Sequence, residues 1–229
     1  EARLKWHTDL GMPANKYRYH DHVKLAHYAD AALDIEFEFP FGFKELEGIH
    51  SRTDFDLTRH QEFSKKKQQY FDNDIDEATG KPYGNYIPYV IETSIGLDRM
   101  FLAVLSNAYE EEKITKEDGS TDERVVLHIP AKIAPVKLAI LPLVKKDGLP
   151  EIARELMDSC KGQFKCFYEE KDAIGKRYRR QDAIGTPFCV TIDHQTKEDQ
   201  TVTIRYRDAM TQERVHISKV KEIVLAAIA

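Results

Sequence analysis

Apolar and acidic residues alternate strictly over residues 33–39. The apolar positions in this stretch are Leu33, Ile35, Phe37 and Phe39. A period of two is typical of an antiparallel strand that buries one face and exposes the other. Pro40 and Gly42 then predict a turn into a second strand over residues 43–51.

The second predicted strand carries two glutamates on the same side as apolar residues. This side comprises Phe43, Glu45, Glu47 and Ile49. Burying an ionised carboxylate without a partner costs free energy, so this arrangement is unusual. We therefore expect either that this side opens into a polar cleft or that the glutamates lie near an edge.

Other patterns in the first half predict helices over residues 1–12 and 16–32, a further helix from about residue 54 to 63, and a surface loop over residues 72–86. The second of these predicted helices contains three histidines, His20, His22 and His27. Their spacings do not stack them on one helical face, so satisfied or surface histidines are favoured over metal ligands. We expect a mixed sheet with flanking helices.

A strand-like stretch changes into a helix-like stretch at Gly96. Apolar residues alternate before this glycine and recur at helical spacing from Met100 to Leu105. The first N–H groups of a helix suit phosphate, and Arg99 would add a planar charge that bonds phosphate through two hydrogen bonds. Alternatively, Arg99 is an ordinary helix-start charge and Glu92 a solvated carboxylate at the end of a strand.

The second half alternates strands with helices. A charged stretch over residues 110–124 predicts a solvated hinge, after which a new unit begins at Val125. The predicted strands cover residues 136–144, 165–168, 187–192, 200–206 and 214–217, and the predicted helices cover residues 149–160, 176–183 and 220–229. This order predicts a doubly wound α/β domain with a terminal hairpin. No Gly-rich loop follows its first strand, which disfavours a dinucleotide cofactor.

Composition narrows the class of protein. The 229 residues are 41% hydrophobic and 32% charged, and no apolar run approaches the length of about 18 residues that spans a bilayer, so no membrane partner is expected. The three cysteines, Cys160, Cys166 and Cys189, form no CxxC pair, which argues against a disulfide framework and against zinc and favours a cytoplasmic location. Residues 1–129 carry a net charge of −9, whereas residues 130–229 carry +4.

Three segments resemble one enzyme family in their order and spacing. They are residues 44–57 (KELEGIHSRTDFDL), residues 92–99 (ETSIGLDR) and residues 175–190 (GKRYRRQDAIGTPFCV). They resemble the dimeric type of glycyl-tRNA synthetase, and the chain looks like its C-terminal portion. The resemblance implies an α+β catalytic part with an antiparallel sheet over residues 1–124, followed by a doubly wound mixed-sheet α/β anticodon-binding domain over residues 125–229.

The resemblance also implies roles for individual residues. Arg99 would be catalytic, holding the ATP tail as part of class II motif 3. The expected ATP-binding residues are Glu45, Leu46, Gly96, Leu97, Asp98 and Arg99, and the expected glycine-binding residues are Glu92, Ser94 and Gly96. Glu45 is a candidate ligand for Mg²⁺ bound with ATP, and Glu47 would reinforce the acidic field. No tightly bound cofactor is expected.

Basic residues of the second half are candidates for tRNA(Gly) contacts, with a solvated basic face as the alternative. They are Lys176, Arg177, Arg179, Arg180, Arg205 and Arg207. The other implied partners are glycine, ATP and a second copy of the full-length enzyme.

Class II motifs 1 and 2 are missing from these residues. Because the first residue is Glu1, with no signal peptide, we expect a cut from a longer protein that is inactive alone. One alternative is a non-catalytic relative, such as a polymerase accessory subunit that binds nucleic acid. A class II synthetase for another amino acid is the second alternative.

Overall fold

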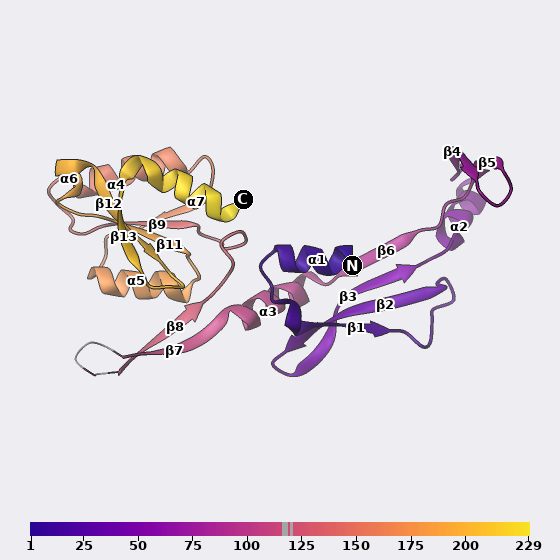
Figure 1. The fold of residues 1–229 in the computed structure, drawn as a ribbon, viewed down its shortest axis with the longest axis horizontal. Helices are drawn as coiled ribbons and strands as arrows, with labels where there is room; N and C mark the ends of the chain where they lie inside the picture. The colour runs from indigo at the N-terminus through magenta and orange to yellow at the C-terminus, as the bar shows by residue number, and fades with distance from the viewer. Residues whose placement is uncertain (116–118, 120) are drawn as a thin grey trace. The chain divides into compact units, whose positions relative to one another are not determined.

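The computed structural model describes residues 1–115, 119 and 121–229 (Figure 1). By packing, these residues divide into two compact units. We call residues 13–103 the sheet unit, and residues 1–12 with 104–229 the α/β unit. The division falls within helix α3 (Leu97–Ala108). The domain boundary expected between residues 124 and 125 stays a prediction.

A four-stranded antiparallel sheet forms the centre of the sheet unit, with the strand order β1-β2-β3-β6. The strands are β1 (Tyr17–Asp21), β2 (Ala31–Phe39), β3 (Gly42–Ser51) and β6 (Ile91–Ile95). The alternation over residues 33–39 correctly predicted β2: Ile35, Phe37 and Phe39 are at most 3% exposed. One face of this sheet therefore supplies the apolar core.

A β-bulge interrupts the pairing of β2 with β3. Ile35 lies opposite Glu47 and Glu36 lies opposite Glu45, so Leu46 is an additional residue on β3. Directly opposed residues of an antiparallel pair share a face, and successive residues of one strand alternate. The two glutamates therefore lie on opposite faces, and the prediction that they share one side was wrong.

Two further predictions for this unit were wrong. Residues 16–32 form a short 3₁₀ turn, η1 (Ala14–Lys16), the strand β1 and a connection, because β1 pairs along β2. Residues 72–86 lie largely in a hairpin of β4 (Tyr70–Asp76) and β5 (Lys81–Tyr86) instead of a loop. Gly80, with a φ of +69°, lies in its turn. The helix expected near residue 54 is α2 (Phe55–Ser64).

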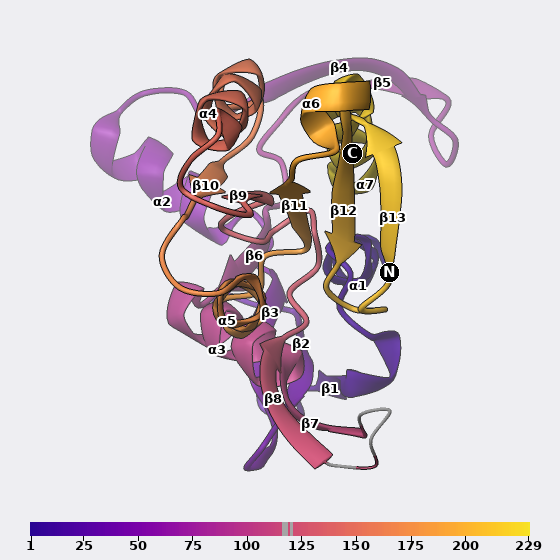
Figure 2. The same cartoon turned by 90° about the vertical axis from the view of Figure 1, so that its left-hand side faces the viewer.

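The α/β unit has the fold class that the sequence predicted. Its five-stranded mixed sheet has the order β10-β9-β11-β12-β13, with the first three strands parallel and the last two forming an antiparallel hairpin. The strands are β9 (Leu138–Pro142), β10 (Cys166–Tyr168), β11 (Phe188–Ile192), β12 (Thr201–Tyr206) and β13 (Gln212–His216). Figure 2 shows this sheet from the side.

Helices cover both faces of this sheet. They are α4 (Leu149–Cys160), α5 (Ile174–Ala183), α6 (Thr196–Asp199), η2 (Ile217–Lys219) and α7 (Val220–Ile228). Residues of α4 and α7 pack on one face with Leu138 and Ile140, whereas α5 packs on the other face with Leu141 (Figure 1). This two-sided covering explains why β9 is buried along its whole length.

The charged stretch before this sheet is a hairpin and not a hinge. It consists of β7 (Tyr109–Thr115) and β8 (Thr121–Leu127), and the remaining residues of the stretch, 116–118 and 120, lie outside the described residues. Arg124 and Val126 alternate inward on β8 and are at most 2% exposed. The unit also contains α1 (Ala2–Asp9). In the described part of the chain, no helix has the length and apolar character needed to cross a membrane.

Candidate functional site

The sheet of the sheet unit has one polar face, opposite the apolar core. Register pairs join His20 to Asp34, Asp34 to Gly48, and Gly48 to Ser94. Because opposed residues share a face, these pairs trace it across all four strands. The polar face comprises Arg18, His20, Asp34, Glu36, Glu45, Gly48, His50, Glu92 and Ser94. It brings the expected glycine-binding residues Glu92 and Ser94 onto one surface with Glu45.

Arg99 links the start of α3 to the bulged strand. Its Nη1 donates to the backbone carbonyl oxygen of Glu45 at 2.5 Å and lies 3.7 Å from Oε2 of the same residue. Both side chains are 55% exposed. The backbone carbonyl of Gly96 accepts from the N–H of Met100, so Gly96 lies at the strand-to-helix junction, between β6 and α3, as predicted. The structure therefore joins Arg99 and Glu45 at an accessible helix start.

A second cation, Arg52, holds Glu92. Arg52 Nη1 lies 2.5 Å from Glu92 Oε2, and Nε lies 2.5 Å from Asp56 Oδ2. The guanidinium also stacks 3.9 Å from the ring centroid of Tyr28. The hydrogen bonds with Asp56 and Glu92 raise the pKa of Arg52, and the hydrogen bond from Arg52 lowers the pKa of Asp56. Arg52 is thus held by Asp56 and Tyr28 while it binds one oxygen of the Glu92 carboxylate.

Sequence reasoning gave Arg52 and Asp56 no role, although both lie in the segment 44–57 that carried the resemblance. It also missed Asp34 and Glu36, which are 6% and 8% exposed. Because Asp34 and Glu36 alternate with apolar residues, the sequence predicted that their side chains face solvent. Side chains of the neighbouring strand cover them instead. The feature of the sequence that could have indicated their burial is the set of basic residues in β1, the strand that pairs with β2.

Two histidines and an arginine of the β1 region contact the two buried carboxylates, Asp34 and Glu36. His22 Nε2 lies 2.7 Å from Asp34 Oδ2, and Arg18 Nε lies 2.5 Å from Glu36 Oε2. His20 Nδ1 is 3.5 Å from Glu36 Oε1. The interpretation of His20 and His22 as partnered histidines is confirmed. These contacts fix the positions of the side chains on this part of the polar face.

Gly48 leaves space for His50 on the polar face. A Cβ atom at Gly48 would lie 3.0 Å from Cε1 of His50 and 3.6 Å from Oδ1 of Asp34. The ring of His50 in turn meets the ring of His22 edge-on, with centroids 6.0 Å apart. A side chain at position 48 would therefore require the ring of His50 to shift.

The other expected ATP-binding residues differ in their exposure. Leu97 is 82% exposed and Asp98 is exposed beside it at the start of α3, whereas Leu46 is only 2% exposed. Leu46 is therefore available for a ligand through its backbone only. Glu47 lies on the apolar face and is fully buried, so its carboxylate cannot contact a ligand on the polar face.

Half of the basic residues expected to contact tRNA are buried. Arg177, Arg205 and Arg207 are 2%, 6% and 2% exposed. The guanidinium of Arg177 donates to backbone carbonyl oxygens at the end of β9, including Pro142 O at 2.6 Å. These three guanidinium groups cannot reach a nucleic acid in this structure, so their expected tRNA contact is corrected to a structural role. Lys176 is exposed, and Arg179 and Arg180 are partly exposed.

Asp182 explains the burial of Arg205. Its carboxylate, fully buried, accepts from Arg205 Nη1 at 2.7 Å and from Arg124 Nη1 at 3.1 Å. One carboxylate between two guanidinium groups satisfies its hydrogen bonds and offsets the cost of burial. This arrangement ties β8 and β12 to α5.

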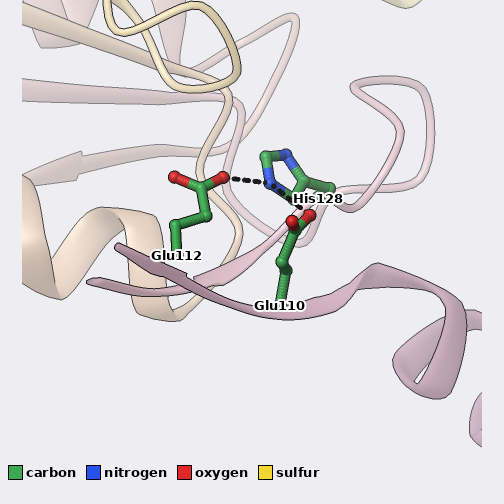
Figure 3. A group of neighbouring side chains, drawn as sticks. All are labelled: Glu110, Glu112 and His128. Atoms are coloured by element: carbon green, nitrogen blue, oxygen red, sulfur yellow. Dashed lines mark hydrogen bonds and ion pairs between the residues drawn. The ribbon is translucent and has the colours of Figure 1, made fainter. Parts of the chain in front are cut away.

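A group of metal-ligand types lies where β7 and β8 meet, and Figure 3 shows its side chains. His128 Nε2 lies 2.8 Å from Glu112 Oε1 and 3.5 Å from Glu110 Oε2, and its Nδ1 lies 2.6 Å from Asp208 Oδ1. Glu110, Glu112 and His128 each offer one ligand atom within 4.8 Å of the others. Arg124, however, already pairs with Glu112. The contacts with Arg124 and His128 offset desolvation and lower the pKa of Glu112, so an ion pair network accounts for this group.

Comparison with known proteins confirms the resemblance that the sequence suggested. Residues 137–227 match the family model described as "Anticodon binding domain". The chain is 52% identical to the glycine–tRNA ligase of Chlorobaculum tepidum over 97% of this chain and 45% of that protein. It is 51% identical to that of Treponema denticola over 94% and 47%. The chain thus spans about half the length of the curated relatives it matches.

Proposed function

We propose that this chain, which shares about half its residues with glycine–tRNA ligases over nearly its whole length, is the C-terminal portion of such a ligase. The sheet unit would supply one wall of a class II active site, and the α/β unit would bind the anticodon region of tRNA(Gly). One observation carries the proposal: the polar face, with Glu92 and Ser94 on its edge strand and Glu45 beside Arg99.

Glycine would bind at Glu92. The side chain is 35% exposed, so one side of the carboxylate remains accessible while Arg52 holds the other. A carboxylate suits the ammonium group of glycine. Ser94, two residues further along β6 and on the same face, would lie beside the amino acid.

ATP would bind at the start of α3. Arg99 would stabilise the negative charge of the phosphates while the carboxylate oxygen of glycine attacks the α-phosphorus. The new O–P bond gives glycyl-adenylate, and the bond to the leaving pyrophosphate breaks. Glycine would then pass from the adenylate to tRNA(Gly), releasing AMP.

The exposed carboxylate of Glu45, 3.7 Å from Arg99, fits the role of a Mg²⁺ ligand beside these phosphates. The metal would neutralise phosphate charge when it is bound. Glu45 would also orient Arg99, because its backbone carbonyl accepts from the guanidinium. A cytoplasmic location and a homodimer of the full-length protein complete the proposal.

An ATP–pyrophosphate exchange assay with glycine tests the proposal. Full-length protein should exchange label with glycine as the preferred amino acid, whereas this chain alone should not exchange, because it spans only about half of its relatives. Exchange by the chain alone would contradict the assignment of a partial site. Exchange with a different amino acid would favour a synthetase of another specificity.

A binding-only protein is the second candidate, since the α/β unit matches a domain that binds nucleic acid by its description. Binding of tRNA by full-length protein without any exchange would favour it. The Glu45–Arg99 and Arg52–Glu92 pairs argue for the ligase, because a binding-only protein has no need for accessible charges at these positions.

A further inference from the structure

Side chains from three segments of the α/β unit meet at His128. Glu110 and Glu112 are two residues apart on β7, so both project from the same face of that strand. His128 directly follows β8, and its N–H donates to Ala108 O at 2.6 Å, which continues the hairpin pairing beside these glutamates. Asp208 lies in the turn between β12 and β13. The two glutamates of β7 point toward the histidine ring (Figure 3).

Both ring nitrogens of His128 face carboxylate oxygens. Nδ1 lies 2.6 Å from Asp208 Oδ1, whereas Nε2 lies 2.8 Å from Glu112 Oε1 and 3.5 Å from Glu110 Oε2. A neutral imidazole carries only one N–H, so in that state one nitrogen would direct its lone pair at a carboxylate. A cation on that nitrogen, either a proton or a metal ion, removes the repulsion. The ion pair network is the first of these cases, and a bound metal ion is the second.

Asp208 selects Nε2 as the nitrogen that a metal ion could reach. Its carboxylate is held by Arg207, whose Nε lies 2.7 Å from Oδ1 and whose Nη2 lies 3.0 Å from Oδ2. When the N–H at Nδ1 of His128 donates to this carboxylate, the lone pair of the ring is on Nε2. Metal-binding histidines in proteins commonly have a carboxylate on the far nitrogen in this way. The lone pair is thus directed at Glu110 and Glu112.

Arg124 leaves one oxygen of Glu112 for a metal ion. Its Nε and Nη2 both donate to Glu112 Oε2, whereas Oε1 is the oxygen that faces His128. The Glu110 side chain is 62% exposed, so its carboxylate can move toward an ion and water can complete the coordination. The three ligand atoms lie within 4.8 Å of one another. Tetrahedral ligands at ~2.1 Å from zinc lie about 3.4 Å apart, so only small shifts are needed.

We propose that Glu110, Glu112 and His128 form a binding site for one divalent transition metal ion, with Zn²⁺ as the type. The ligands would be Glu110 Oε2, Glu112 Oε1 and His128 Nε2, with water in the fourth position. An imidazole with two carboxylates suits zinc better than Mg²⁺ or Ca²⁺, which prefer oxygen ligands. None of these ligands is a cysteine, so the spacing of the three cysteines does not bear on this site. A proton on Nε2 is released to solvent when the ion binds.

The bound ion would brace the β7–β8 hairpin. It would join two positions on β7 to the residue that follows β8, and His128 in turn contacts Asp208 beyond the end of β12. An ion that binds the folded chain and not the unfolded chain stabilises the fold by mass action. We therefore expect the melting temperature of the chain to rise with Zn²⁺ concentration.

Isothermal titration of the purified, EDTA-treated chain, without an affinity tag, tests the proposal. We expect one Zn²⁺ bound per chain and a rise in melting temperature that Mg²⁺ at the same concentration does not give. Glu110→Gln and His128→Ala should each remove the binding, whereas Asp208→Asn should weaken it about 10- to 100-fold because the ring loses its orienting carboxylate. Glu111→Gln is the matched control, because residue 111 lies on the opposite face of β7, and it should bind Zn²⁺ like the natural chain.

Melting temperatures without metal show whether each variant is folded. Glu110→Gln should keep that of the natural chain, since Arg124 pairs with Glu112 instead. The proposal is overturned if the natural chain binds no Zn²⁺, or if Glu110→Gln binds it as tightly as the natural chain does. Loss of the binding in His22→Ala would place the ion in the sheet unit and overturn the proposal as well. These measurements do not depend on ligase activity, so the result stands apart from the proposed function.

Discussion

Arg99 Nη1 donates to the backbone carbonyl oxygen of Glu45 at 2.5 Å, joining the first turn of α3 to the bulged strand β3. A backbone carbonyl cannot be removed by substitution at position 45, so this bond anchors the guanidinium whichever side chain stands there. The side chain of Arg99 is 55% exposed, so a phosphate could reach its guanidinium, as proposed. In the proposed site, the side chain of Arg99 would thus contact both the protein backbone and a phosphate.

Replacing Arg99 with alanine in full-length protein should lower the rate of glycine-dependent ATP–pyrophosphate exchange by about 10²- to 10³-fold, because a fixed positive charge is lost where negative charge develops. Arg99→Lys should recover only part of the rate, since an ammonium cannot make two parallel bonds. Arg59→Ala is the control, because Arg59 pairs with Glu62 on the exposed side of α2. Equal rates for Arg99→Ala and the control would contradict the assignment.

Replacing Glu92 with glutamine should raise the KM for glycine by about 10- to 100-fold, because a hydrogen bond between charged groups becomes a weaker one. The KM for ATP should change little. Steady-state exchange kinetics with each substrate varied in turn separate the two effects. Glu62→Gln serves as the matched exposed control, and a rise in the ATP KM alone would argue against a glycine contact.

Lys176 and Arg177 are neighbours on α5 that should respond differently to alanine. Lys176→Ala should weaken tRNA binding across salt concentrations and reduce the slope of log affinity against log salt by about one, with normal stability. Arg177→Ala should instead destabilise the fold, because backbone carbonyls at the end of β9 lose their donor. Filter binding and urea denaturation distinguish the two outcomes; weaker binding by a stable Arg177→Ala protein would contradict the structural role.

Asp182→Asn should lower the free energy of unfolding by about 3–5 kcal/mol, because it leaves Arg124 and Arg205 buried without their shared carboxylate. Asp158→Asn, in an exposed pair with Lys161, should change it by less than about 0.5 kcal/mol. Urea denaturation of both variants provides the measurement. Similar values for the two would show that the buried pairs contribute no more than a surface pair.

Asp193 should contribute a pH-dependent part of the stability of the α/β unit. The hydrogen bond from Arg214 lowers the pKa of Asp193 in the folded chain. An aspartate in the unfolded chain has a pKa of about 4, so the stabilising contribution of Asp193 is present above this pH. It is lost as the pH falls through the lower pKa of Asp193 in the folded chain. The difference in urea midpoint between the natural chain and Asp193→Asn should shrink from pH 5 to pH 2. A constant difference would contradict this.

Patterns in the sequence predicted the elements that depend on burial. The alternation over residues 33–39 identified β2, and the apolar runs identified β9 and β11, because buried strands must be apolar on the faces they hide. The edge strand β1 and the hairpins β4–β5 and β7–β8 escaped prediction. Most of their residues are exposed, so backbone pairing forms these strands with little constraint on side chains.

The candidate site was predictable only in part. Gly96, Arg99, Glu92 and Ser94 were found by resemblance, and their position at the strand-to-helix junction followed from periodicity. Arg52 was missed because its partner Glu92 lies 40 residues away in sequence. No local sequence pattern predicts such an ion pair. It forms because strand β3 lies beside strand β6.

The bulge at Leu46 means that nine residues of β2 pair along ten residues of β3. An alignment of β3 with a regular strand from another protein must therefore place a one-residue gap at Leu46. Without that gap, Glu45 and every residue before it would be matched to the wrong side of the sheet. Deleting Leu46 from the chain should instead give a regular ladder, in which Glu45 directly precedes Glu47 and keeps its place opposite Glu36 on the polar face.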